Sequence, residues 1–151
     1  MTVREKEELR IVVVEDNADD IEILRRCFAK SGAPTRLRIA QDGEEARRLL
    51  EVFSGETAVA LPDLILLDLG LPRTRGIDLL RLIRRPGQLR TVPVVVSTGN
   101  GDERLLRQCM ELGTNLYILK PIALADVMNV IVGVERYWNR SCSLARTRGT
   151  K

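Results

Sequence analysis

The chain has 151 residues and a formal net charge of +3, and its composition is 44% hydrophobic, 30% charged and only 3% aromatic. This length fits one domain with a substantial core, and so few aromatic residues argue against base-stacking platforms for single-stranded nucleic acid. The sequence contains no histidine, which excludes Ser–His and Cys–His catalysis, His-based metal sites and a phosphohistidine on this chain.

Short aliphatic runs alternate along the chain with stretches whose apolar residues recur at helical spacing, such as Ile21, Leu24 and Phe28. The expected strands are residues 10–16, 35–40, 63–68, 92–98 and 115–120. The expected helices are about residues 18–31, 42–53, 76–85, 102–112 and 123–138. Five strands that alternate with five helices predict an α/β domain with a doubly wound, five-stranded parallel sheet covered on both faces.

The domain boundaries and the cellular location also follow from the sequence pattern. We expect an N-terminal extension over residues 1–8, the domain over residues 9–140 and a flexible basic tail over residues 141–151. Three widely spaced cysteines fit reduced thiols, the first residues lack the apolar core of a secretory signal, and no apolar run is long enough to span a membrane. These features predict a cytoplasmic protein with no membrane partner. No nucleic-acid recognition motif accompanies the basic tail, so no nucleic-acid partner is expected.

A carboxylate interrupts the most apolar strand. Five of the six residues from Leu64 to Leu69 are apolar, and the sixth is Asp68. Because an unpaired carboxylate is costly to bury, Asp68 must lie where the strand leaves the core or beside compensating charge. Other strands also end in polar residues, namely Glu15 and Asp16, Ser97 and Thr98, and Lys120. The carboxyl ends of parallel strands meet at one edge of a sheet, so we expect three carboxylates, a hydroxyl and an ammonium group to converge there.

Each of these residues alone also fits a structural role. Asp16 and Asn17 could cap the following helix, Thr98 could be an ordinary strand-end hydroxyl, and Lys120 could belong to a turn. Their conjunction favours a functional site instead. Carboxylates without histidine or cysteine offer hard oxygen ligands that suit Mg2+. A carboxylate can also attack phosphorus to give an aspartyl phosphate, with Lys120 paired to the phosphoryl group and Thr98 donating a hydrogen bond to it.

Four segments resemble the receiver domains of response regulators in two-component signalling. They are VVVEDN, LILLDLGLP, PVVVST and YILKP. The spacing agrees, since Thr98 lies 30 residues after Asp68 and Lys120 lies 22 residues after Thr98, as in chemotaxis-type receivers. The resemblance covers about residues 9–138 and implies a single domain with the flavodoxin-like strand order 2-1-3-4-5.

The resemblance implies a phosphoacceptor signalling protein rather than an ordinary enzyme. Asp68 would accept a phosphoryl group from a partner histidine kinase, with Thr98 and Lys120 beside it. The implied Mg2+ ligands are Glu15, Asp16, Asp68 and the backbone carbonyl of Gly70. Tyr117 falls on the aromatic switch position, where the ring turns inward as Thr98 moves toward the phosphoryl group. Such a protein promotes its own phosphorylation and dephosphorylation, and it signals by protein contacts or acts as a phosphate relay or sink.

Further sequence features bear on the partner kinase and on competing functions. The segments PDLILLDL, LPR and ERYW resemble the receivers that partner bacterial phytochrome kinases, which implies a kinase of that type. The alternative within the family is an interaction scaffold that acts without phosphorylation, and the presence of all the phosphorylation groups argues against it. A haloacid-dehalogenase-type phosphatase needs a second acid two residues after the nucleophile, where this chain has Gly70. The chain also lacks the glycine motifs that cradle nucleotide phosphates.

The last expected helix carries more apolar residues than one buried face needs. One stripe, the expected core face, contains Leu124, Val127, Met128, Ile131 and Trp138. The second stripe contains Ala123, Val130, Val134 and Tyr137. Either the core face is wide, or Val130, Val134 and Tyr137 form a surface for a partner or for a homodimer.

Overall fold

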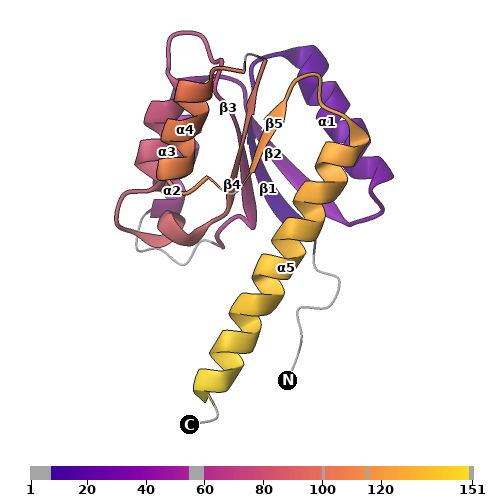
Figure 1. Ribbon diagram of the computed structural model, residues 1–151, viewed down its shortest axis with the longest axis vertical. Coiled ribbons are helices and arrows are strands. Elements are labelled where there is room, and N and C mark those ends of the chain that lie inside the picture. The colour runs from indigo at the N-terminus through magenta and orange to yellow at the C-terminus, as the bar shows by residue number, and fades with distance from the viewer. Residues whose placement is uncertain (1–7, 55–59, 100, 115, 150–151) are drawn as a thin grey trace.

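In the computed structural model, five parallel strands form one sheet in the order β2-β1-β3-β4-β5 (Figure 1). The structure describes the backbone of residues 8–54, 60–99, 101–114 and 116–149, and the side chains through Arg136 apart from that of Ser54. The strands are β1 (Leu9–Val14), β2 (Thr35–Ala40), β3 (Leu64–Asp68), β4 (Val94–Thr98) and β5 (Leu116–Leu119). The predicted parallel sheet and its flavodoxin-like strand order are confirmed.

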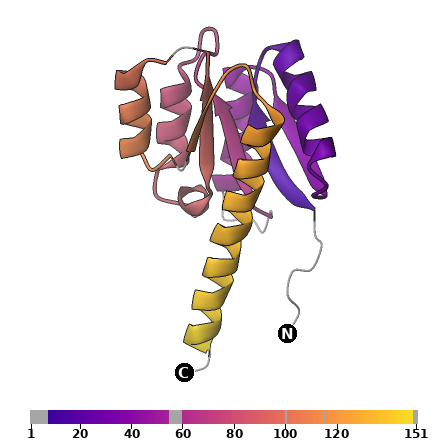
Figure 2. The ribbon, with the colours of Figure 1, turned by 45° about the vertical axis from the view of Figure 1, so that its right-hand side comes forward.

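Helices cover both faces of the sheet, as the doubly wound prediction requires. They are α1 (Ala18–Lys30), α2 (Gly43–Ser54), α3 (Gly76–Ile83), α4 (Glu103–Glu111) and α5 (Leu124–Gly149). Figures 1 and 2 show α1 and α5 on one face and α2, α3 and α4 on the other. A short 3-10 helix, η1 (Gln88–Thr91), precedes β4. The sequence pattern does not predict η1, because one short turn is too brief to show a periodicity.

The residues of the inner strands divide between two apolar cores. In β1, Val12 and Val14 belong to the core beneath α2, α3 and α4, whereas Ile11 and Val13 belong to the core beneath α1 and α5. All residues of β3 and β4 are buried, as expected for central strands of a parallel sheet. Two cores therefore hold β3 on both of its faces, and they fix the position of the carboxylate at its end.

Helix α5 is longer than the sequence pattern predicts. It continues to Gly149 and so includes residues 141–149, which were expected to form a flexible tail. No proline occurs after Leu124, so the sequence contains no residue of that kind to interrupt the helix. Figures 1 and 2 show α5 projecting past the end of the sheet. Among the described residues, the structure contains no helix with the length and apolar character needed to cross a bilayer.

The buried face of α5 also differs from the prediction. Val130 and Val134 are only 2% and 6% exposed and belong to the core beneath α1, so their prediction as a partner surface is wrong and a wide core face explains them. Conversely, Leu124 and Met128 were expected in the core but are 40% and 39% exposed. The reason is that α5 packs against α1 as well as the sheet, which turns its second apolar stripe inward. The side chains of Tyr137 and Trp138 lie outside the described residues.

Arg84, which directly follows α3, ties three segments of the chain together. Its guanidinium donates to the carbonyl oxygens of Leu112 and Gly113 after α4, at 2.8 and 2.9 Å. It also donates to those of Arg90 and Val92 before β4, at 3.0 and 2.9 Å. The carbonyls at a helix C-terminus have no partner within the helix, so a cation there satisfies them and interacts favourably with the helix dipole.

We expect Arg84→Met to lower the free energy of unfolding by about 2 kcal/mol, because partly buried carbonyl oxygens lose a charged donor. Urea denaturation measures the change. The matched control is Arg85→Met, since the neighbouring Arg85 side chain is exposed and its loss should cost less than about 0.5 kcal/mol. Equal losses in the two variants would contradict the role assigned to Arg84.

Candidate functional site

The carboxyl ends of four strands bring the expected site residues to one edge of the sheet. Asp68 and Thr98 are the last residues of β3 and β4. Glu15 and Asp16 directly follow β1, and Lys120 directly follows β5. Because β1 and β4 are the two neighbours of β3, the side chain of Asp68 lies between groups that come from both sides.

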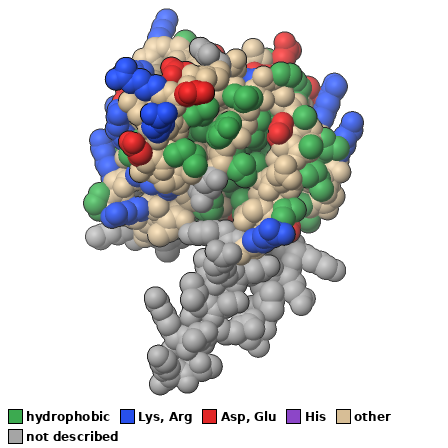
Figure 3. Space-filling model, viewed as in Figure 1, with side chains coloured by type: hydrophobic (Ala, Val, Ile, Leu, Met, Phe, Trp, Pro, Cys, Tyr) green, Lys and Arg blue, Asp and Glu red, His purple; other side chains and the backbone are tan. Residues whose placement is uncertain are grey.

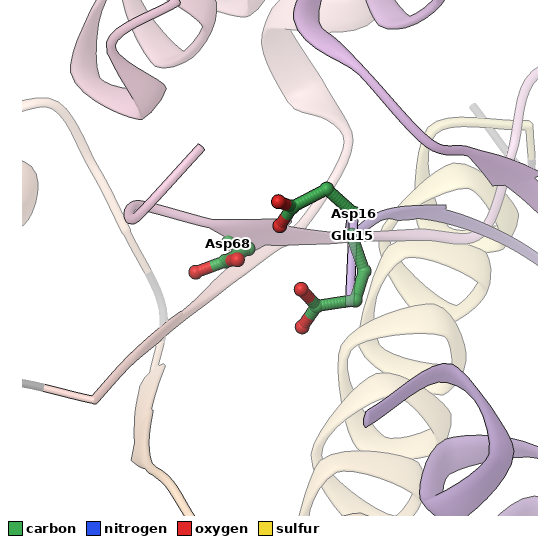
Figure 4. A group of neighbouring side chains, drawn as sticks. All are labelled: Glu15, Asp16 and Asp68. Atoms are coloured by element: carbon green, nitrogen blue, oxygen red, sulfur yellow. The ribbon is translucent and has the colours of Figure 1, made fainter. Parts of the chain in front are cut away.

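Three carboxylates form a compact acidic cluster. Oxygen atoms of Glu15, Asp16 and Asp68 lie within 4.8 Å of one another. Figure 4 shows the carboxylates of Glu15 and Asp16 pointing toward the side on which Asp68 lies. Glu15 and Asp68 are 1% and 4% exposed, whereas Asp16 is exposed. Like charges at this separation repel, so the cluster favours a cation, and an all-oxygen donor set of this kind fits Mg2+.

The turn after β3 holds the carboxylate of Asp68 in place. The backbone N–H of Gly70 donates to Asp68 Oδ1 at 2.9 Å. Asp68 Oδ2 lies on the other side of the group, 3.3 Å from Lys120 Nζ. One oxygen is therefore bound by the backbone and the other faces a cation. The Gly70 carbonyl, expected as a metal ligand, stays a prediction.

Lys120 makes ion pairs with two further carboxylates. Its Nζ lies 2.7 Å from Glu15 Oε1 and 2.8 Å from Asp20 Oδ2. Burial by itself lowers the pKa of Lys120, but the hydrogen bonds to Asp20 and Glu15 and the charge of Asp68 outweigh burial, so the net effect is a raised pKa. The backbone N–H of Lys120 donates to the Thr98 carbonyl at 2.9 Å, and the peptide bond to Pro121 is cis. Lys120 is thus a fixed, protonated cation.

The environment of Glu15 disfavours its ionised form. Burial raises the pKa of Glu15, the neighbouring Asp68 carboxylate raises it further, and Lys120 opposes both effects, with a net value of about 7. Glu15 also accepts from the backbone N–H of Asn17 at 3.3 Å. The single positive charge of Lys120 therefore does not fully compensate the negative charge of the buried carboxylates around it.

Asp20 is a site residue that the sequence analysis missed. The helix-cap alternative holds for Asn17, whose Oδ1 accepts from the backbone N–H of Asp20 at 3.0 Å at the start of α1. This cap places Asp20 in the first turn, where its carboxylate reaches Lys120. A signal was present, because Asp20 stands four residues before Leu24 and so shares the buried stripe of α1, whereas Asp19 does not.

Of the two remaining predicted residues, Thr98 is buried and Tyr117 is exposed. Thr98 is 5% exposed at the end of β4, one position beyond Ser97, the residue paired with Asp68 in the sheet. Tyr117 on β5 is 47% exposed, so its ring points outward in this structure. This is one of the two positions expected of an aromatic switch, and the movement of the ring stays a prediction.

The fold and this site are those of a known class of signalling domain. Residues 11–132 match the family described as the response regulator receiver domain, and the chain belongs to this family. Receiver domains are signalling modules that histidine kinases phosphorylate. The sequence-based identification of the family is confirmed.

Three relatives show where the chain lies within the family. The probable methanogenesis regulatory protein FilR2 of Methanothrix harundinacea is 34% identical, over 87% of this chain and 86% of FilR2. Response regulator Rcp1 of Synechocystis sp. is 31% identical, over 89% of this chain and 91% of Rcp1. A structure of the Mn2+-bound form of Rcp1 has a TM-score of 0.69, with 85% of this chain and 93% of that chain covered. The phosphorylated cyanobacterial phytochrome response regulator RcpA has a TM-score of 0.71 at 32% identity, with 89% of this chain and 96% of that chain covered.

Proposed function

We propose that Asp68 accepts a phosphoryl group from a phosphohistidine of a partner kinase. The observation that supports this most directly is the buried Asp68 carboxylate, with one oxygen bound by the Gly70 N–H and the other facing Lys120. In the transfer, an Asp68 oxygen forms a bond to phosphorus and the N–P bond of the phosphohistidine breaks, with the electron pair leaving on the imidazole. Hydrolysis of the aspartyl phosphate by water then restores Asp68 and releases phosphate.

The other residues of the site would neutralise and position the charge. The Lys120 ammonium would pair with a phosphoryl oxygen, and the Thr98 hydroxyl would donate a hydrogen bond to another. Glu15, Asp16, Asp68 and the Gly70 carbonyl would hold Mg2+. When bound, Mg2+ supplies the positive charge that the carboxylate cluster lacks and that phosphoryl oxygens require. By this arrangement the chain promotes its own phosphorylation and dephosphorylation.

A receiver that works as a scaffold without phosphorylation is not favoured. Such a protein would have no need of a lysine beside the buried carboxylate at the end of β3, because burying these charges is costly. A cytoplasmic location is proposed as well, because a histidine kinase offers its phosphohistidine there.

The similarity to RcpA supports a phytochrome-type kinase as the donor. The test is phosphoryl transfer from radiolabelled, autophosphorylated histidine kinases of phytochrome and non-phytochrome types in Mg2+ buffer. We expect label to leave the phytochrome-type kinase and appear on this chain within seconds to minutes, faster than from the other kinases. Transfer from a non-phytochrome kinase alone would contradict the donor type, and failure of all donors, small phosphodonors included, would contradict the function.

The proposed output is a protein contact on the side of the sheet next to Lys120. Most of the exposed large hydrophobic side chains of the described residues lie on β5 and α5, and Figure 3 shows hydrophobic side chains gathered on this face. We call them the β5–α5 surface: Leu116, Tyr117, Leu119, Leu124, Met128 and Val132. It contains the expected switch residue. We propose that a second copy of the chain binds here, because one apolar patch on a two-fold axis suffices for a homodimer.

We expect Met128→Glu to weaken the homodimer at least about tenfold, since it places a charge inside an apolar contact. Light scattering coupled to size-exclusion chromatography measures the mass over a range of concentrations. Val52→Glu is the matched control, because Val52 on α2 is also about half exposed, at 49%, and lies outside this surface. A wild-type chain that stays monomeric with and without phosphorylation would contradict the homodimer.

A further inference from the structure

The cation of the site is shared with a carboxylate that belongs to neither the acidic cluster nor a strand end. Lys120 Nζ lies 2.8 Å from Asp20 Oδ2 but 3.3 Å from Asp68 Oδ2. The proposed phosphoacceptor is therefore the more distant of the two. Asp20 belongs to α1, and its oxygens are not part of the group formed by Glu15, Asp16 and Asp68.

Asp20 is held so that its carboxylate meets Lys120. Its backbone N–H is bound by the Asn17 cap, and only 18% of its side chain is exposed, against 17% for that of Lys120. Among the described residues, Asp20 forms its ion pair with Lys120. The pair is partly screened from solvent and has good geometry, so its attraction is stronger than that of an exposed surface pair.

Phosphorylation would change the balance of charge around Lys120. A carboxylate carries one negative charge, whereas a phosphoryl group carries about two and presents three acceptor oxygens. The Lys120 ammonium has three N–H donors and already contacts Glu15, Asp20 and Asp68, so it can serve these oxygens fully only by giving up part of its contacts with Glu15 and Asp20. In the phosphorylated state, a Lys120 N–H that stays bound to Asp20 is not available to the phosphoryl group. In the resting state, the same ion pair with Asp20 draws the positive charge of Lys120 away from the acidic cluster.

We infer that Asp20 is a positioning residue that competes with the phosphoryl group for Lys120 and so favours the unphosphorylated state. This inference rests on the proposed phosphoacceptor role of Asp68. It predicts two effects of opposite sign in Asp20→Asn. The phosphoryl group is held more tightly, because Lys120 is released toward it. Mg2+ is held more weakly in the resting state, because Lys120 then acts wholly on the metal-binding carboxylates.

The experiment compares wild type, Asp20→Asn and the matched control Asp19→Asn. Asp19 lies in the same helical turn and carries the same charge, but it is exposed and does not contact Lys120. Calorimetric titration measures Mg2+ affinity, and fluorine NMR measures the affinity for beryllofluoride, an inorganic mimic of the phosphoryl group, at saturating Mg2+. We expect Asp20→Asn to bind Mg2+ about fivefold more weakly and beryllofluoride about fivefold more tightly, and Asp19→Asn to change neither more than about twofold.

A merely structural role of Asp20 would weaken both affinities together, and that result would overturn the inference. So would equal shifts in Asp19→Asn. In a Lys120→Gln background, Asp20→Asn should have no further effect on either affinity, because Asp20 acts through Lys120. If the wild-type chain bound no beryllofluoride and accepted no phosphoryl group, the proposed function would fail. The Mg2+ titration would then decide on Asp20 alone, and an unchanged Mg2+ affinity in Asp20→Asn would overturn its role.

Discussion

Asp68→Asn is expected to reduce phosphoryl transfer to the chain by at least about a thousandfold, because an amide is no nucleophile toward phosphorus. The substitution preserves the size of the side chain and the acceptor for the Gly70 N–H, which binds Asp68 Oδ1 at 2.9 Å. It removes only the charge and the attacking oxygen. Intact-mass measurement after incubation with acetyl phosphate and Mg2+ gives the fraction of chains that carry a phosphoryl group.

The same variant should remain folded, and its stability is a second readout. Asp68 is 4% exposed and lies beside Glu15 and Asp16, so removing its charge relieves repulsion in the metal-free protein. We expect Asp68→Asn to unfold at a temperature equal to or above that of wild type in the absence of Mg2+, as is common when a site charge is removed. A large drop in melting temperature would contradict this account of the cluster, and labelling equal to that of wild type would contradict the phosphoacceptor role.

Gly76→Ala is expected to lower the free energy of unfolding by about 3 kcal/mol, the largest effect on stability that we anticipate for a single methyl group. Gly76 begins α3, and a Cβ atom there would lie 2.6 Å from Leu69 Cα and 2.9 Å from the carbonyl oxygen of Asp68. Both are backbone atoms and cannot rotate away. The start of α3 would have to move off the end of β3, which carries the proposed phosphoacceptor.

Urea denaturation measures the stability of Gly76→Ala, and Gly99→Ala is its matched control. Gly99 also follows a strand of the site edge, but a Cβ atom there would meet nothing within 4 Å. Its replacement should leave stability within about 0.5 kcal/mol of wild type. If both glycines tolerated alanine equally well, the close approach of α3 to β3 would be refuted.

Much of the fold was predictable because its signals are local. Runs such as Leu64–Leu67 are strongly apolar, and alternation of strands with helices leaves few arrangements other than a covered parallel sheet. The carboxyl-edge rule then brings Asp68, Thr98 and Lys120 together without any knowledge of distances. The family resemblance added the strand order, which periodicity alone does not give.

What the sequence did not predict depends on packing and on helical phase. Val130 and Val134 looked surplus to one helix face, but α5 packs against α1 and the sheet at once and buries both. Met128, which was expected in the core, is exposed instead. Asp20 was overlooked because two adjacent acids begin α1, and only the helical phase, with Asp20 four residues before the buried Leu24, separates it from Asp19. The burial of Val130 and Val134, by contrast, depends on the angle at which α5 sits on its sheet, which no short motif contains.

The central claim, that Asp68 accepts the phosphoryl group, is tested most directly by locating the group on the chain. Wild-type protein is phosphorylated in Mg2+ buffer, reduced with borohydride, which converts an acyl phosphate to an alcohol, and digested for peptide mass mapping. We predict that the modified residue is Asp68, and that chelation of Mg2+ before the reaction prevents the modification. Modification of Glu15, Asp16 or Asp20 with Asp68 intact, or no modification of the folded protein by any donor, would contradict the claim.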